Sequence, residues 1–275
     1  MDFSAAPVSA SAMEFIAEIG LNHNGSIDLA KTMIRAAAEA GATVAKFQTY
    51  TAAERVAKEH PLFHVLTECE LSKRDCIELS NECAEYGIHF LSTAFGLESL
   101  ELLGELGQKT VKISSFSLTD RSLIEAALGA GIQLIISTGA STWDEIVACS
   151  ELVGSYSVDC VFLHCISAYP VALESDLHLG NIPRLKALTG KRVGFSDHSV
   201  GPEAFFWSAL AGATIFEKHF TTDNQLPGPD QAMSANPEVF EASVDLARRG
   251  MVILGEGRVN VFDQEQAVLP FRTRS

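Results

Sequence analysis

The sequence predicts a single-domain α/β protein with the (β/α)8, or TIM-barrel, fold. Short apolar segments alternate with amphipathic segments of helical period from residue 14 to residue 258. Eight such pairs over roughly 240 residues match the usual size of this barrel. A doubly wound open sheet would alternate in the same way, but it rarely reaches eight equal units. No Gly-x-Gly-x-x-Gly turn follows the first predicted strand, so the barrel is favoured.

The predicted strands share one pattern, in which an apolar run ends abruptly in polar or charged residues. Six of them cover residues 15–19, 43–48, 88–92, 110–113, 133–136 and 158–163. The seventh begins at Arg192, and the eighth covers residues 214–216. Between them the helical period predicts helices over residues 27–40, 72–86, 95–106, 121–129, 142–153, 182–188, 203–210 and 237–251.

Turn and capping residues set the boundaries of these elements. Ser72 is an expected N-cap and Gly87 lies just beyond the end of the same helix. Residues 51–71 are predicted to form a polar loop. Residues 1–13, which lack a basic segment typical of a signal peptide, are predicted to be a disordered tail, and residues 259–275 a C-terminal tail.

Composition limits the possible partners. The formal net charge of −15 argues against binding to nucleic acid or to an anionic membrane. No apolar run approaches the ~18 residues of a transmembrane helix. The six cysteines are scattered without a Cys-x-x-Cys pair, and buried thiols are the expectation for Cys76 and Cys83 within one helix. A reduced, cytoplasmic protein is predicted.

His198 and His219 are candidate ligands of a divalent cation. Each follows an apolar strand, and one βα unit separates them. In a parallel sheet both side chains would emerge at the same strand ends, and imidazole suits Mn, Fe, Co, Ni and Zn alike. A hydrogen-bonded core position explains either histidine alone equally well. The pair, each next to a carboxylate (Asp197 and Glu217), favours a metal site.

Polar residues at the other strand ends predict an active site at this rim, where barrels of this class place their chemistry. They are Glu18, Lys46, Ser92, Lys112, Ser115, Ser137, His164, Ser167, Tyr169, Ser196 and Glu217. Lys46 and Lys112 interrupt apolar strands, and a buried ammonium group needs an anionic partner. Two such lysines beside serine hydroxyls predict a site for a phosphate or carboxylate ligand. The alternative interpretation is that one lysine forms a Schiff base with the substrate. A nucleophile within residues 164–167 is a weaker hypothesis, because no separate base and orienting acid accompany it.

Five segments of this sequence resemble the sialic acid synthases, barrel enzymes that condense phosphoenolpyruvate with an N-acetylated amino sugar aldehyde. These segments are Ala-Glu-Ile-Gly-Leu-Asn-His-Asn-Gly at 17–25, Lys-Phe-Gln-Thr at 46–49, Ile-Ser-Thr-Gly at 136–139, Ser-Asp-His at 196–198 and Pro-Gly-Pro-Asp at 227–230. The resemblance runs from about residue 15 to residue 257.

The resemblance implies roles for particular residues. A metal, usually Mn²⁺ with Mg²⁺ or Co²⁺ as alternatives, would be held by His198 and His219. Glu18 and Asp230 would act near the metal-bound water or the sugar, as catalytic residues together with Lys46 and Lys112. The implied substrate-binding residues are Lys46, Lys112, Ser115, Ser137, Ser167, Tyr169, Ser196, Asn22 and Glu217.

Three features depart from the family pattern. Ser167 stands where an Asn is common, the 51–71 loop is short, and the sequence ends before the C-terminal antifreeze-like domain that usually covers the sugar. The resemblance implies a homodimer. The departures imply either that the acceptor is a different aldehyde from N-acetylmannosamine or that another chain supplies the lid. The remaining alternatives are a metal-dependent pyruvate aldolase or lyase on the same barrel, and a ligand-binding or partner-dependent subunit without a lid.

Overall fold

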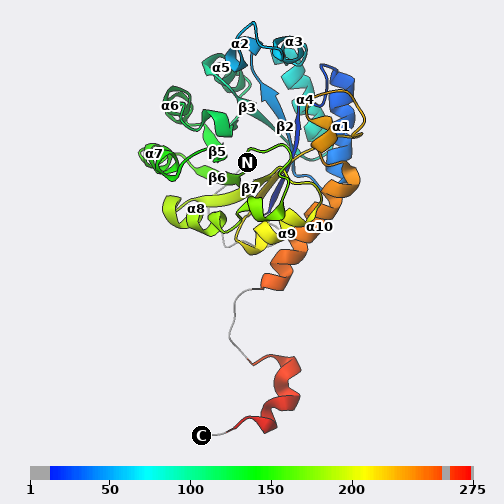
Figure 1. Ribbon diagram of the computed structural model, residues 1–275, viewed down its shortest axis with the longest axis vertical. Helices are drawn as coiled ribbons and strands as arrows, with labels where there is room; N and C mark the ends of the chain where they lie inside the picture. Colours follow the sequence, from blue (N-terminus) through cyan, green and yellow to red (C-terminus); the bar gives the residue numbers. More distant parts are fainter. Residues whose placement is uncertain (1–12, 256–260, 274–275) are drawn as a thin grey trace.

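The chain forms a closed barrel of eight parallel strands, which confirms the predicted fold. The computed structural model describes residues 13–255 and 261–273. Each strand pairs with the next along the chain, and β1 closes the barrel against β8 (Figure 1). The strands are β1 (Glu14–Gly20), β2 (Val44–Thr49), β3 (His89–Ala94), β4 (Thr110–Ile113), β5 (Gln133–Ser137), β6 (Cys160–Cys165), β7 (Arg192–Asp197) and β8 (Ile215–His219).

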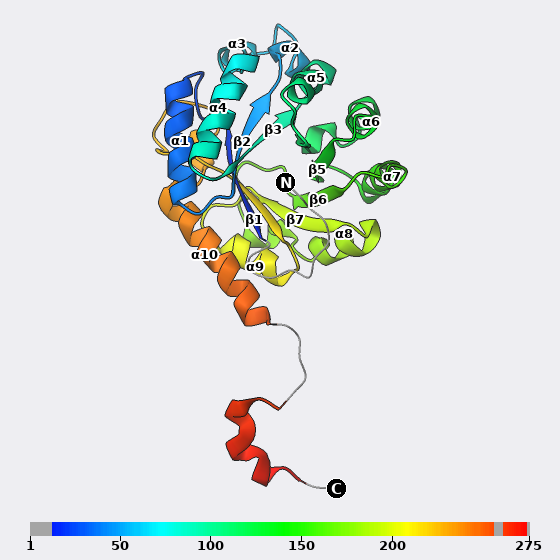
Figure 2. The same cartoon turned by 180° about the vertical axis from the view of Figure 1, so that it is seen from behind.

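Among the described residues, eight α-helices have eight or more residues. Helices surround the barrel of strands (Figures 1 and 2). Ser72 caps its helix as expected, because its hydroxyl accepts a hydrogen bond from the Asp75 amide while the Asp75 carboxylate accepts from the Ser72 amide. The helices are α1 (Ile27–Glu39), α4 (Lys73–Glu85), α5 (Leu97–Glu105), α6 (Arg121–Gly129), α7 (Trp143–Gly154), α8 (Asn181–Thr189), α9 (Glu203–Leu210) and α10 (Pro237–Leu254).

The segment between β2 and α4 differs from the prediction of a loop. It contains two short helices, α2 (Ala52–Arg55) and α3 (Phe63–Glu68). Both are too short for a helical period to be visible in the sequence, so they are stabilised by contacts with the rest of the fold. Short 3₁₀ helices follow β4 and β6 and precede α10, namely η2 (Ser115–Ser117), η3 (Glu174–Leu177) and η4 (Gln231–Met233).

The ends of the chain can be compared with the predicted tails only in part. Residues 1–12, 259–260 and 274–275 lie outside the described residues. Met13, which the predicted N-terminal tail includes, is buried in the core. Within the predicted C-terminal tail, Asp263–Phe271 forms the 3₁₀ element η5. In the described ranges no helix combines the length and the apolar character that a membrane crossing requires.

The core has two parts, which is typical of a barrel. A large apolar cluster fills the space between the strands and the helices and includes stacked phenylalanines such as Phe15 and Phe216, whose ring centroids lie 5.4 Å apart. A smaller cluster fills the barrel interior and consists of Ile16, Val44, Leu91, Ile135, Val161, Leu163 and Ile215.

The interior of the barrel changes from apolar to polar within two residues along most strands. Residues two positions apart on a strand point to the same face. The inward residue that follows the apolar layer is polar on most strands: Ile16 leads to Glu18, Val44 to Lys46, Leu91 to Thr93, Ile135 to Ser137 and Ile215 to Glu217. A closely packed apolar floor therefore lies directly beneath a layer of charged and hydroxyl groups at the carboxyl ends of the strands.

Candidate active site

A cavity of about 550 Å³ opens above this polar layer. Its walls come from the carboxyl ends of the strands and from the segments that follow them. The cavity brings together nearly all of the residues that the sequence predicts for the site: Glu18, Lys46, Lys112, Ser115, Ser137, Tyr169, Ser196, His198, Glu217, His219 and Asp230. Residues spread over more than two hundred positions of the chain thus share one site.

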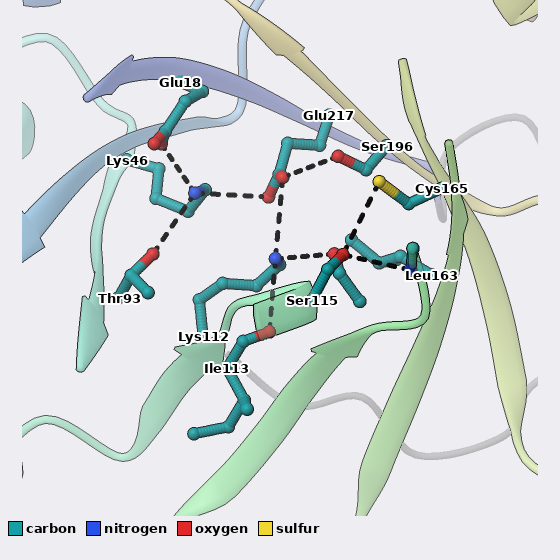
Figure 3. A network of polar contacts seen from close by, with 12 residues as sticks. Glu18, Lys46, Thr93, Lys112, Ile113, Ser115, Leu163, Cys165, Ser196 and Glu217 are labelled. Carbon is teal, nitrogen blue, oxygen red and sulfur yellow. Dashed lines mark hydrogen bonds and ion pairs between the residues drawn. The ribbon is translucent and has the colours of Figure 1, made fainter. Parts of the chain in front are cut away.

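Two lysines and two glutamates that line the cavity form one network of polar contacts (Figure 3). Lys46 Nζ lies 2.6 Å from Glu18 Oε2 and 3.5 Å from Glu217 Oε2. Lys112 Nζ lies 3.6 Å from Glu217 Oε1 and donates a hydrogen bond of 2.6 Å to Ser137 Oγ. All four charged side chains are almost completely buried. Glu217 is shared between two ammonium groups, so each lysine keeps part of its capacity for another anion.

Burial and neighbouring charges set different protonation tendencies for these groups. Burial raises the pKa of Glu18, which the adjacent Lys46 only partly offsets. For Glu217, burial is outweighed by Lys112 and Lys46, and its pKa falls to about 2. Burial lowers the pKa of Lys112, whereas for Lys46 the carboxylates outweigh burial and the pKa is raised. Glu217 is thus a fixed negative charge, and Glu18 is the carboxyl group more suited to proton transfer.

Serine hydroxyls surround the lysines. Ser196 Oγ donates to Glu217 Oε1 at 2.9 Å, and Ser115 Oγ accepts from the Gly139 amide at 3.0 Å. A Cβ atom on Gly139 would lie 2.3 Å from Ser167 Oγ and 2.9 Å from Ser115 Oγ, so only glycine fits between these hydroxyls. Ser167, predicted to bind substrate, packs against Gly139 and does not line the cavity.

His198 and His219 lie side by side at the cavity wall, with their ring centroids 5.6 Å apart. The Ile166 carbonyl lies 2.7 Å from His198 Nδ1, so Nδ1 donates to it and Nε2 is the ring nitrogen left for a ligand. His219 Nδ1 is buried without a hydrogen-bond partner and lies 3.9 Å from Asp230 Oδ2.

The donor set at the two histidines fits a divalent cation with an incomplete protein shell. Burial, together with the neighbouring His198, lowers the pKa of His219 well below its usual value, which keeps this ring neutral. Within residues 13–255 and 261–273 no group of three or more His, Cys, Asp or Glu side chains is arranged to hold a metal. The two histidines would therefore leave coordination positions to water or substrate, as open catalytic sites do.

Asn22 is a second predicted substrate-binding residue that lies outside the cavity wall. Its side chain is fully buried and does not line the cavity. Asn22 Nδ2 donates to the Phe220 carbonyl and to Ser234 Oγ, both at 2.8 Å. These bonds hold the segment after β1 against the segment after β8, so the Asn22 amide nitrogen is committed to the scaffold.

Two strand-end predictions chose the wrong member of a neighbouring pair. Ser92 faces away from the cavity and shares a hydrogen bond of 2.7 Å with Thr49 Oγ1. Thr93 is the inward residue, and its Oγ1 accepts from Lys46 Nζ at 3.3 Å. On β6, His164 faces outward with its Nε2 2.8 Å from the Leu177 carbonyl, whereas Cys165 lines the cavity. Neighbouring residues on a strand point to opposite faces, and both predicted strands ended two residues before the observed ends at Ala94 and Cys165, so the last inward residue of each strand was missed.

Gln48 and Arg55 also line the cavity, although neither was predicted as a site residue. Gln48 Nε2 donates to Glu18 Oε1 at 2.9 Å, and it could have been found by its period-two spacing from Lys46. Arg55 belongs to the segment predicted as a loop, and no local signal pointed to it.

The barrel and its charged rim define an enzyme of the class that binds small anionic substrates at the strand ends. A family model described as the NeuB family matches residues 33–259. This chain belongs to the NeuB family, and it is a phosphoenolpyruvate-dependent synthase that forms a carbon–carbon bond.

Individual relatives agree with this membership. The chain is 35% identical over 276 residues to N,N'-diacetyllegionaminic acid synthase of Legionella pneumophila, covering 94% of this chain and 76% of the relative. It is 32% identical over 261 residues to pseudaminic acid synthase of Campylobacter jejuni, covering 90% of this chain and 76% of the relative. The crystal structure of an N-acetylneuraminic acid (sialic acid) synthetase from Leptospira borgpetersenii is similar with a TM-score of 0.91 at 34% identity, covering 94% of this chain and 91% of that one.

Proposed function

We propose that this protein condenses phosphoenolpyruvate with an aldehyde sugar related to N-acetylmannosamine, forms a 2-keto-3-deoxy sugar acid and releases phosphate by C–O cleavage. The observation that carries the proposal is the pair of buried lysines, Lys46 and Lys112, on either side of Glu217. The catalytic unit is the barrel of residues 14–258, working as a homodimer in the cytoplasm.

The donor substrate would occupy the lysine side of the cavity. Phosphoenolpyruvate carries a phosphate and a carboxylate, and Lys46 and Lys112 offer one ammonium group to each end of such a molecule. Hydroxyls of Ser115, Ser137 and Ser196 would complete its hydrogen bonds. Because these groups are already in place in the folded protein, they stabilise developing charge without reorganisation.

The acceptor would lie on the histidine side. His198 and His219 would hold Mn²⁺, with Mg²⁺ or Co²⁺ as alternatives, and the ion would supply polarisation of the aldehyde oxygen. Tyr169 and Asp230 line the cavity next to these histidines and would contact the sugar. The Tyr169 and His198 ring centroids lie 4.2 Å apart, and Asp230 Oδ2 lies 3.9 Å from His219 Nδ1. Holding the two substrates face to face converts a bimolecular reaction into an intramolecular one.

The proposed reaction has three steps. The π electrons of phosphoenolpyruvate form a bond from carbon 3 to the aldehyde carbon, and the aldehyde oxygen takes a proton. Water adds at carbon 2 and loses a proton, for which Glu18 is the candidate acid and base. The C–O bond of the hemiketal phosphate then breaks, the hydroxyl on carbon 2 becomes the keto group, and its proton passes to the inorganic phosphate that leaves. Lys46 and Lys112 offset the charge on the leaving phosphate.

Isotopic labelling tests this proposal. Phosphoenolpyruvate labelled with ¹⁸O at the bridging oxygen is incubated with the protein, Mn²⁺ and a panel of aldehyde sugars. The label is expected in the released phosphate. Label retained in the organic product would mean P–O cleavage. In a parallel incubation with pyruvate in place of phosphoenolpyruvate, formation of the same product would favour an aldolase.

A further inference from the structure

Arg55 reaches the cavity from the short helix α2 (Ala52–Arg55), a segment that supplies none of the residues assigned above. Its guanidinium carbon lies 4.0 Å from the ring centroid of Phe95 and 5.0 Å from that of Tyr50. These two rings are themselves perpendicular, with centroids 5.9 Å apart. Stacking on an aromatic face holds the guanidinium plane in one orientation.

The helix that carries Arg55 is anchored at several points. Glu54 Oε2 accepts from the Thr51 amide at 3.0 Å, and Glu54 Oε1 accepts from the Ser99 amide, at the start of α5, at 3.2 Å. The contact requires glycine at position 96, since a Cβ there would lie 2.3 Å from Glu54 Oε1. Glu70 Oε1 accepts from the Ala52 amide at 2.6 Å. Arg55 is thus positioned before any ligand arrives, which reduces the entropy cost of binding.

Most of the hydrogen-bonding capacity of Arg55 is unused. A guanidinium has five N–H donors, and here Nη1 donates to Gln48 Oε1 at 2.6 Å. Among the described residues, no carboxylate oxygen lies within 4.0 Å of the Arg55 nitrogens. A half-buried cation with free donors facing a cavity calls for an oxygen acceptor from a ligand.

The contacts of Arg55 favour a role in binding the acceptor and not phosphoenolpyruvate. Gln48, which accepts from Arg55, also donates to Glu18 Oε1, and Glu18 in turn pairs with Lys46. Arg55 is therefore two side chains removed from the lysine that would hold the donor. Asp230 is close enough for its charge to act on Arg55, and its Oδ2 lies 3.9 Å from His219 Nδ1, where the sugar is proposed to bind.

We propose that Arg55 is a specificity-determining residue that binds a hydrogen-bond-accepting oxygen on a substituent of the acceptor sugar. The inference rests on the proposed function, which supplies the acceptor. The shared chemistry is an oxygen acceptor, whether the carbonyl of an acylamino group or an oxyanion such as a phosphate. Glu54, Phe95 and Tyr50 act as positioning residues for it.

The test is a kinetic comparison of Arg55→Gln and Arg55→Lys with the wild type. Arg184 provides a matched control, because its guanidinium stacks on Trp143 at 4.0 Å, the same distance as Arg55 on Phe95, but it does not line the cavity. Phosphate release is measured with phosphoenolpyruvate and N-acetylmannosamine, its 6-phosphate or mannose. Loss of a charged hydrogen bond predicts a rise in the acceptor KM of about tenfold to a hundredfold in Arg55→Gln. The KM for phosphoenolpyruvate should be unchanged, as should both constants in Arg184→Gln.

The choice of acceptor identifies the oxygen. If an oxyanion binds Arg55, the 6-phosphate is preferred, its KM rises with salt, and Arg55→Lys retains part of the affinity. If a neutral carbonyl binds, N-acetylmannosamine is preferred over mannose and salt has little effect. An acceptor KM unchanged in Arg55→Gln, or an equal rise for both substrates, overturns the inference and leaves the proposed function standing. No phosphate release by the wild type with any of the three sugars would overturn both.

Discussion

Strands β7 and β8 contribute to two buried ionic clusters, of which only one borders a cavity. On their outer face, Lys218 Nζ lies 2.6 Å from both Asp197 Oδ2 and the Ser199 carbonyl, and Asp197 Oδ1 accepts from the amide and hydroxyl of Ser199 at 2.8 and 2.7 Å. On their inner face, Glu217 is shared by Lys46 and Lys112 at the floor of the cavity. The outer pair is closed, with one anion for one cation and its remaining bonds made to Ser199. The inner cluster opens into space that a ligand can fill.

Burial of charge therefore does not by itself mark a functional site in this protein. Asp197 and Lys218 are as buried as Glu217 and Lys112. What distinguishes the inner group is that its charges border a cavity. The outer pair instead fixes Ser199, one residue beyond His198, and so holds the end of β7 in place.

The largest effect is expected from removal of either histidine at the edge of the inner cluster. His198→Ala and His219→Ala should each lose bound Mn²⁺ and activity to background, because two protein ligands cannot be reduced to one without loss of the ion. Metal content by mass spectrometry and circular dichroism of the purified variants test this together. Full metal content in both folded variants would contradict the assignment.

Breaking the outer pair should reduce stability. Asp197→Asn leaves the Lys218 ammonium buried without its anion, and removal of one partner of a buried pair costs about 3–5 kcal/mol. Chemical denaturation of the wild type and the variant measures the loss. The double variant Asp197→Asn, Lys218→Met should regain part of it, since no unpaired charge remains. A single variant as stable as the wild type would mean that the pair has no structural role.

Breaking the inner cluster should mainly reduce activity. Lys112→Met removes a cation that would stabilise charge on the donor, and loss of one such group costs roughly 10²–10³ in kcat. Stability should fall less than in Asp197→Asn, because Glu217 keeps Lys46 and Ser196 as partners. Steady-state phosphate release and denaturation are measured on the same preparation. The reverse pattern, with stability lost and kcat kept, would remove the distinction between the two clusters.

A smaller effect is expected at His23, a fully buried residue that belongs to neither cluster. Burial lowers its pKa to about 4 from 6.5. The unfolded chain therefore binds more protons between these values, and stability falls as the pH drops from 6.5 towards 4. Linkage gives about 2 kcal/mol of loss between pH 7 and pH 5. His23→Gln should flatten the difference in denaturation midpoint over this range, and identical pH profiles would refute the assignment.

How far the sequence could predict this protein depends on the range of the interactions involved. Strand and helix order followed from local periodicity, since an apolar run and an amphipathic run are each visible within about ten residues. Lys46 and Lys112 could be recognised because a charge within an apolar strand has few explanations. Both lysines, and both histidines, lie where the predicted barrel would bring them.

Tertiary structure alone decided which face each strand-end residue occupies and what the segment after β2 does. Thr93 rather than Ser92 meets Lys46 because a strand reverses its faces every residue, so a shift of one position in the predicted strand exchanges them. Arg55 lines the cavity because Glu54 and Glu70 anchor the four-residue helix that carries it. Asn22 does not line it, because its side-chain amide donates to Phe220 and Ser234. Those partners of Glu54 and Asn22 lie 45 to 212 residues away along the chain, beyond any local pattern.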